Sequence, residues 1–152
     1  DINVQIEKKV TSGFNFTFMY MNQMYNQYAV EGHGEPAVKS NIFVYDGKYK
    51  LSRKVTLRTE LQYLQTKQDH GDWLYGLAEV SVLPYLMFSL SDQWNCGGDE
   101  GHYYMATVTA NYRSNRFMLG FGRTRAGYNC SGGVCRWVPE SRGVTFSYNY
   151  NF

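Results

Sequence analysis

The sequence has no long hydrophobic run. None of its 152 residues fall in a stretch of the roughly 18 to 20 consecutive apolar residues that a membrane-spanning helix needs. The sequence also has no large excess of one charge sign, because it contains 15 Lys and Arg and 13 Asp and Glu. The basic residues are scattered rather than gathered into a stripe, which disfavours a nucleic-acid partner. Proline and cysteine are rare, at 3 each, and the chain begins at Asp1 without an initiator methionine or signal peptide, which predicts a processed or truncated chain.

Aromatic residues are abundant, with 14 Tyr, 9 Phe and 3 Trp. In residues 144–152, apolar and small polar residues alternate without a fault, and the chain stops on Phe152. A strand has a side-chain period of two, so one face of this segment suits lipid and the other suits water. The ending resembles the terminal strand of a bacterial outer-membrane β-barrel. The resemblance implies that Phe152 belongs to the signal read by the barrel-insertion machinery.

The same alternation recurs along the whole chain, interrupted by turn residues, and predicts about nine strands. Short turns alternate with longer loops, as in barrels whose periplasmic turns are short and extracellular loops long. Because only alternate residues meet lipid, such a chain is hydrophilic on average. We therefore predict an all-β, antiparallel up-and-down transmembrane β-barrel in the bacterial outer membrane, with residues 1–152 as one domain. The expected strands are 2–7, 14–21, 41–51, 55–63, 74–82, 86–91, 104–113, 117–122 and 144–152.

An odd strand number conflicts with the even number of single-chain bacterial barrels. Either the chain is the C-terminal part of a larger barrel, or residues 1 to 10 are not a wall strand and the rest closes as eight. We favour the larger barrel, because the first segment alternates as well as the others. With the chain end in the periplasm, the loops 31–40, 67–72, 95–101 and 126–143 face outside.

Charged side chains are expected on the face opposite lipid, since charges cannot face hydrocarbon cheaply. In a wide barrel they would line a water-filled passage and select solutes. In an eight-stranded barrel they would interlock as a packed salt-bridge network. The predicted lumen-lining residues are Glu7, Lys9, Asp46, Lys48, Lys50, Arg58, Glu60, Glu79 and Arg113.

Residues 127–145 contain the run Cys-x-Gly-Gly-Val-Cys-Arg-aromatic-Val-Pro at 130–139. With the terminal strand, this stretch resembles the C-terminus of an uncharacterised family of Bacteroidota outer-membrane barrel proteins. The resemblance covers about the last quarter of the chain. It implies a barrel of greater length and a place in the outer membrane, but no reaction.

Cys130 and Cys135 fall in a predicted outer loop, in an oxidising setting that favours a local disulfide. Two reduced thiols or a metal site are the alternatives, although two sulfurs alone do not complete a tetrahedral shell. Cys96 either pairs with a cysteine outside this chain or stays unpaired. The three histidines, His33, His70 and His102, lie in predicted loops beside acidic residues, where a shared surface metal site is conceivable.

The function best indicated by these patterns is passive or substrate-linked solute passage through a charged lumen, with membrane lipids, the barrel-insertion machinery and a small solute as partners. No cofactor is expected. An enzyme is disfavoured, because no histidine falls within a predicted strand to act as a base for a serine. The alternative is a small surface-display or adhesion barrel that acts through its outer loops. A soluble lipocalin-like cup is disfavoured, because its aromatic residues would crowd the exposed face.

Overall fold

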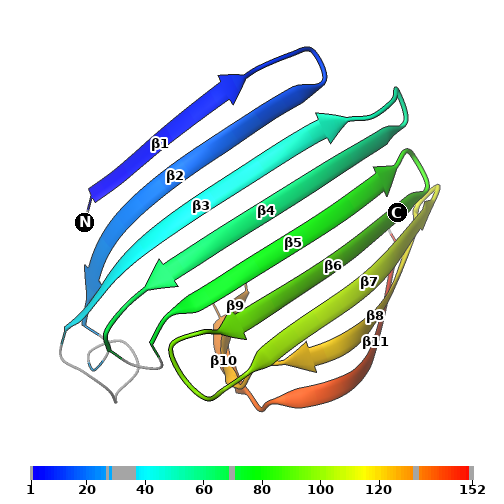
Figure 1. Ribbon diagram of the computed structural model, residues 1–152. Helices are drawn as coiled ribbons and strands as arrows, with labels where there is room; N and C mark the ends of the chain where they lie inside the picture. The colour runs from blue at the N-terminus through cyan, green and yellow to red at the C-terminus, as the bar shows by residue number, and fades with distance from the viewer. Residues whose placement is uncertain (1, 27, 29–36, 69–70, 132–133, 151–152) are drawn as a thin grey trace.

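The computed structural model describes residues 2–26, 28, 37–68, 71–131 and 134–150, with the backbone alone for 25, 127–131, 134–136 and 138. Nine strands form one sheet in the order β1-β2-β3-β4-β5-β6-β7-β8-β11 (Figure 1). Every neighbouring pair is antiparallel. The strands are β1 (Ile2–Lys9), β2 (Phe14–Tyr25), β3 (Val38–Lys50), β4 (Val55–Gln65), β5 (Trp73–Val82), β6 (Leu86–Asn95), β7 (His102–Tyr112), β8 (Asn115–Thr124) and β11 (Ser141–Tyr150).

This arrangement confirms the prediction of nine antiparallel up-and-down strands. The connections also alternate as predicted. Short connections at 10–13, 51–54, 83–85 and 113–114 lie at one end of the sheet, called here the turn end. Longer connections at 26–37, 66–72, 96–101 and 125–140 lie at the other end, called here the loop end.

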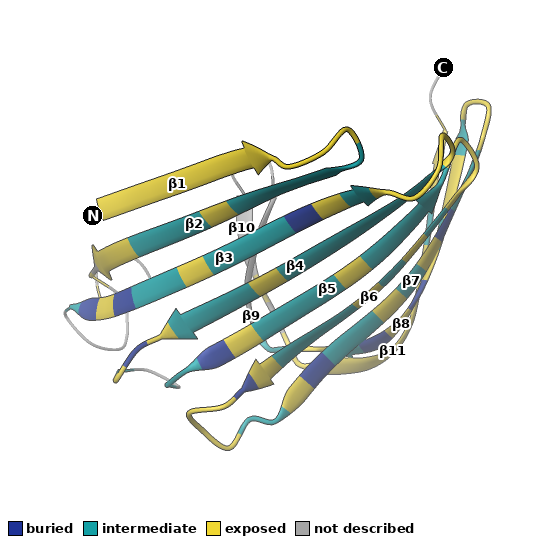
Figure 2. Ribbon diagram, turned by 45° about the horizontal axis from the view of Figure 1, so that its top comes forward, coloured by how far each residue is buried: buried dark blue, intermediate teal, exposed yellow. Residues whose placement is uncertain are grey.

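The sheet is curled rather than flat. β1 to β6 form a broad twisted surface, and β7, β8 and β11 turn away behind it (Figures 1 and 2). Among the described residues, β1 and β11 form the two edges and do not pair with each other. The sheet therefore has a convex and a concave face, and it is open along one side.

The connection at 125–140 differs from the prediction, which made it a loop. It contains a second, two-stranded sheet formed by β9 (Gly127–Ser131) and β10 (Val134–Val138). Aromatic and β-branched residues such as Tyr128, Val134 and Trp137 favour strands. The short segments were missed because each is too brief to display a clear period of two.

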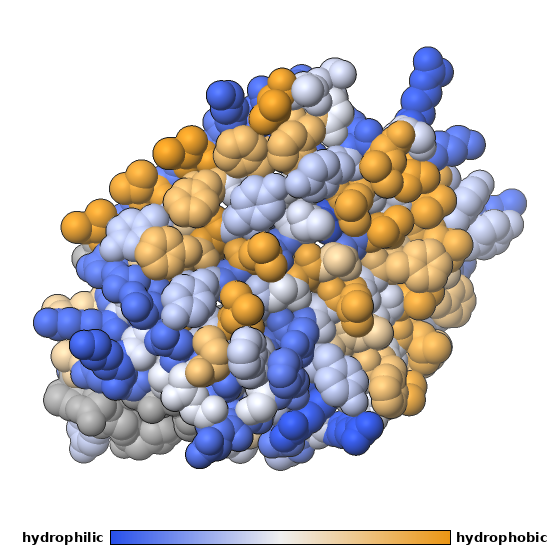
Figure 3. All heavy atoms as spheres, in the orientation of Figure 1, coloured by the Kyte–Doolittle hydropathy of each residue, from blue (hydrophilic) through white to orange (hydrophobic). Residues whose placement is uncertain are grey.

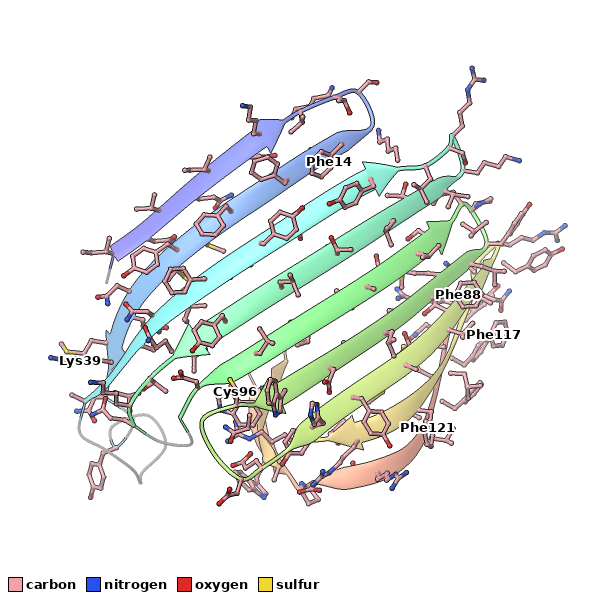
Figure 4. The ribbon with its side chains drawn as sticks, viewed as in Figure 1. Phe14, Lys39, Phe88, Cys96, Phe117 and Phe121 are labelled. Carbon is pink, nitrogen blue, oxygen red and sulfur yellow. The ribbon has the colours of Figure 1, made fainter. Side chains whose placement is uncertain are left out.

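Burial is inverted with respect to a water-soluble sheet protein. Of the described hydrophobic side chains, the buried ones are Val38, Trp73 and Tyr103. Large apolar side chains on the convex face are instead open to the surroundings, with Leu90 60% and Phe146 67% exposed. Figure 3 shows apolar side chains spread over this face, with hydrophilic ones gathered toward the loop end. Figure 4 shows phenylalanine rings of β2, β6 and β8 on its outer side.

The described part of the chain contains no helix with the length and apolar character needed to cross a membrane.

Two glycines meet on the concave face where the sheet bends away. Gly122 of β8 pairs with Gly143 of β11. A Cβ atom at Gly122 would clash with the carbonyl oxygen of Tyr104 and lie 2.9 Å from the Cα of Met105. A Cβ atom at Gly143 would have no atom within 4 Å. The absent side chain of Gly122 therefore lets β7 and β8 approach closely.

We predict that Gly122→Ala destabilises the folded sheet by about 1 to 3 kcal/mol, as expected for overpacking against atoms that cannot move away. Gly143→Ala is the matched control, because its methyl group enters open space. The urea midpoint of the intact, folded protein checks this. Equal midpoints for the two variants would contradict the close approach at Gly122.

Candidate functional site

The charges of the concave face are arranged in two rows across neighbouring strands. The first, called the basic row, contains Lys9 of β1, Lys48 of β3 and Arg58 of β4, which the pairing register brings side by side through Asn15 of β2. Glu79 of β5 follows next to Arg58 and ends this row.

The second, called the acidic row, lies two residues nearer the loop end on the same strands. It contains Glu7 of β1, Asp46 of β3 and Glu60 of β4, connected through Thr17 of β2. Two residues along an antiparallel strand correspond to about 7 Å. A basic row and an acidic row thus run in parallel across the same wall.

Like charges directly opposite each other on paired strands repel. Here Lys48 faces Arg58, and Asp46 faces Glu60. Arg58 offsets this repulsion by reaching diagonally into the acidic row. Its Nη2 atom donates to Asp46 Oδ2 at 2.7 Å and its Nε atom to the same oxygen at 3.0 Å. Nη2 also donates to Glu60 Oε2, so one guanidinium group bridges both carboxylates.

The rows line a hollow of about 430 Å³ on the concave face. The side chain of Glu60 is 12% exposed and accepts a further hydrogen bond from the amide of Gln62. Lys48 is exposed and lies on the same wall. Hydrogen bonds therefore fix the guanidinium group of Arg58 against the two carboxylates, whereas the ammonium group of Lys48 is open to solvent.

The basic row continues as small side chains across the other strands of the sheet. In continuation of the basic row, β6, β7, β8 and β11 contribute Ser89, Thr107, Gly120 and Thr145. The hydroxyl groups of Ser89 and Thr107 form a hydrogen bond of 2.5 Å. The concave face of β6, β7, β8 and β11 thus carries this small-residue row beside larger side chains, Met87, Met105 and Met118, which lie two residues away along their strands.

The remaining predicted lumen residues fall in two places. Lys50 lies at the end of β3 on the concave side. Arg113 was expected within the seventh strand, but it lies in the turn after β7 with a φ of 53°. Its guanidinium carbon is 5.4 Å from the ring centroid of Tyr112, so it covers that ring instead of joining the charge rows.

Cys130 and Cys135 are backbone partners in the β9–β10 pair, and the structure describes nothing of their side chains. Directly opposed residues of antiparallel strands have Cα atoms about 4.5 to 5.5 Å apart, a spacing that a disulfide can bridge. The disulfide stays a prediction. Cys96 is exposed, and its thiol donates to the carbonyl oxygen of Asp72 at 3.5 Å. Phe152 lies outside the described residues.

His33 and His70 also lie outside the described residues. His102 is the first residue of β7 and lies on the convex face. Its Nδ1 atom lies 2.7 Å from Asp92 Oδ2. Its ring stacks on Trp94 at a centroid distance of 5.4 Å. Within the described ranges, no group of three or more His, Cys, Asp or Glu residues could hold a metal ion.

A group of aromatic and charged residues at the loop end was missed by sequence reasoning. We call it the loop-end cluster, and it contains Trp73, Glu100, Tyr103, Arg123, Arg125 and Glu140. Its aromatic members are buried, each 8% exposed, with ring centroids 6.1 Å apart. The only signal in the sequence was that Trp73 and Tyr103 fall on the polar face of their strands.

Two arginines connect this cluster to the loops. Arg125 lies over the ring of Trp73, 4.4 Å from the centroid, and its Nε atom donates to Glu100 Oε2 at 2.9 Å. Arg123 lies 4.8 Å from the centroid of Tyr103 and pairs with Glu140 at 2.6 Å. Both ends of the connection that carries β9 and β10 are therefore anchored to the main sheet.

We predict that Arg58→Met destabilises the intact protein by about 1 to 3 kcal/mol, because it removes the donor that the half-buried carboxylates of Asp46 and Glu60 share. Lys48→Met is the matched control. It removes a charge of the same sign from the neighbouring strand at an exposed position, and should cost less than about 0.5 kcal/mol. Urea unfolding of the intact, folded protein measures both, and a larger cost at Lys48 would contradict the bridging role of Arg58.

Comparison with known proteins gives one match. A family model described as a family of unknown function (DUF6029) matches residues 1–152. No curated protein and no solved structure matches the chain. This match confirms the predicted membership of an uncharacterised family. The Bacteroidota origin stays a prediction. The whole of the chain, residues 1–152, belongs to the DUF6029 family.

Proposed function

We propose that this chain forms wall strands of a β-barrel in the bacterial outer membrane. The observation that carries this proposal is the inverted burial of the sheet. Leu90 in the middle of β6 and Leu119 in β8 are 60% and 54% exposed, whereas carboxylates on the concave face are half-buried and hydrogen-bonded. Exposed apolar area of this extent in water would favour aggregation. Lipid around the convex face removes that difficulty.

Strand length supports the same conclusion. β2 to β8 and β11 are each 10 to 13 residues long. Strands in globular proteins most often have about 5 or 6 residues. A tilted strand of about 9 to 11 residues spans a bilayer. On this proposal the loop end faces the outside of the cell and the turn end faces the periplasm. β11 then runs toward the periplasm, where the proposed insertion signal at Phe152 would meet the barrel-insertion machinery.

We predict that Leu90→Lys lowers the stability of the membrane-inserted protein by about 2 to 4 kcal/mol, the cost of a lysine near the bilayer midplane. The adjacent Ser89→Lys is the matched control, because Ser89 lies on the concave face and its new charge would meet water. The heat-modifiable fraction in purified outer membranes measures the effect. Equal tolerance of both substitutions would contradict lipid around the convex face.

The function we propose for the barrel is passage of small polar solutes, selected by the charge rows. Both signs line the same wall, two residues apart along the strands, so a solute passing along the concave face meets an acidic and then a basic row. On β6, β7, β8 and β11 the basic row continues as the small residues Ser89, Thr107, Gly120 and Thr145. The charge pattern acts electrostatically, without a covalent step or cofactor. Of the described residues, the one histidine, His102, lies on the convex face, opposite to the hydroxyl pair of Ser89 and Thr107.

We predict that Lys48→Glu raises the permeability of the intact protein to a monovalent cation roughly fourfold and lowers that to a monovalent anion by the same factor, so that the cation-to-anion ratio rises roughly 16-fold before screening by salt. A change of two charge units at about 10 Å in water amounts to about 0.8 kcal/mol. Arg113→Glu makes the same charge change in the turn outside the rows and should shift the ratio less. Reversal potentials in planar bilayers under a salt gradient measure both variants. An equal or larger effect at Arg113 would argue against selection by the charge rows.

A second candidate function is surface display or adhesion through the outer loops. The observation in its favour is that the connection at 125–140 folds into its own hairpin, with both ends anchored by Arg123 and Arg125. A preformed loop loses less conformational entropy when it binds a partner. A protein that inserts and shows no conductance in planar bilayers would favour this role over solute passage.

A further inference from the structure

The polarity of the two edge strands restricts how the sheet can close. β1 begins at the loop end and runs to the turn end. Eight successive antiparallel pairings lead from β1 to β11, one for each step of the nine-stranded order. An even number of reversals restores the original direction, so β11 also runs from the loop end to the turn end. Joining these two edges directly would give a parallel pair.

A second copy of the chain would not give either edge an antiparallel partner. Two copies inserted in the same membrane have their loop ends on the same side. The β1 strand of one copy therefore runs in the same direction as the β11 strand of the other. Their pairing would again be parallel, whatever the number of copies. Antiparallel closure needs strands of a different sequence.

Both edges are built as wall strands. β1 carries Ile2, Val4 and Ile6 on the convex face, and every residue of β1 is exposed. Its concave face carries Glu7 and Lys9, which are the last members of the acidic and basic rows at that edge. An edge left unpaired in lipid would expose backbone groups at a cost of several kcal/mol each. Both the backbone and the charge rows thus end abruptly at β1.

We infer that the same polypeptide supplies, from outside residues 1–152, an odd number of further wall strands, the one beside β1 antiparallel to β1 and the one beside β11 antiparallel to β11. This inference rests on the proposed membrane barrel. An odd number follows because only then does the strand beside each edge run from the turn end to the loop end. A strand that leads directly into β1 would do so through an outer connection, since β1 starts at the loop end. This continues the observed alternation of turns and loops.

The direct test is photo-crosslinking in native outer membranes, with the polypeptide at its full natural length. A benzophenone amino acid is introduced separately at Asn3, Gln5 and Glu7, on the concave side of β1. We expect adducts with sequence of the same polypeptide outside residues 1–152. When the probe moves two residues forward along β1, the crosslinked position should move two residues back along its partner, because the residue numbers of antiparallel partners run in opposite directions.

Three results would overturn the inference. Adducts with β11 of the same chain, moving forward along it, would show parallel self-closure. Adducts between isotope-labelled and unlabelled copies would show closure by a second copy. Adducts with an unrelated protein, or with lipid alone, would show that the polypeptide does not supply the neighbouring strand.

A probe at Thr17 separates failure of this inference from failure of the proposed barrel. Thr17 lies in β2, between Glu7 of β1 and Asp46 of β3. Its adducts should fall in β1 and β3. If membrane-inserted protein shows these control adducts, the results at β1 decide the closure alone. If no protein inserts and the control adducts are absent, the proposed barrel itself is wrong and the inference falls with it.

Discussion

The rest of this structure depends on the antiparallel pairing of nine strands in one sheet. This pairing must keep the apolar side chains of every strand on one face and the polar ones on the other. A β-strand presents successive side chains to opposite faces, so one residue of slip would exchange the faces completely. The register holds the same parity across all nine strands. It places Phe18 beside Tyr45 and Leu90 beside Ala106 on the convex face. The inverted burial follows from this register.

The concave face then acquires its charge pattern from the same register. Arg58 connects the two rows, and its hydrogen bonds to Asp46 and Glu60 offset the repulsion that direct neighbours of like charge create. The close packing of β7 and β8 in the curled part of the sheet depends instead on a position without a side chain. Gly122 permits an approach of β8 to β7 that even a methyl group would block. The charge rows lie on β1 to β5, and the close approach at Gly122 lies between β7 and β8.

Local periodicity was enough to predict nine strands, their short turns and which residues of a strand share a face. It could not predict the charge rows, because Lys48 and Arg58 share a row only through the register between β3 and β4. The loop-end cluster was missed for a similar reason. Arg125 meets Trp73 and Glu100 across long stretches of sequence, and no spacing encodes that contact. Arg113 was placed in a strand because alternation extends one residue beyond the last backbone pair, at Tyr112.

The central claim is that the convex face lies in lipid and the concave face in water. The most direct measurement is the accessibility of nitroxide spin labels at successive positions of β6, from Met87 to Gln93, in the intact protein in lipid vesicles. We predict that collisions with oxygen are highest at the even positions, such as Phe88 and Leu90, and collisions with a water-soluble nickel complex at the odd positions, such as Ser89 and Ser91. Uniform accessibility to the nickel complex, or a reversed phase, would contradict the account.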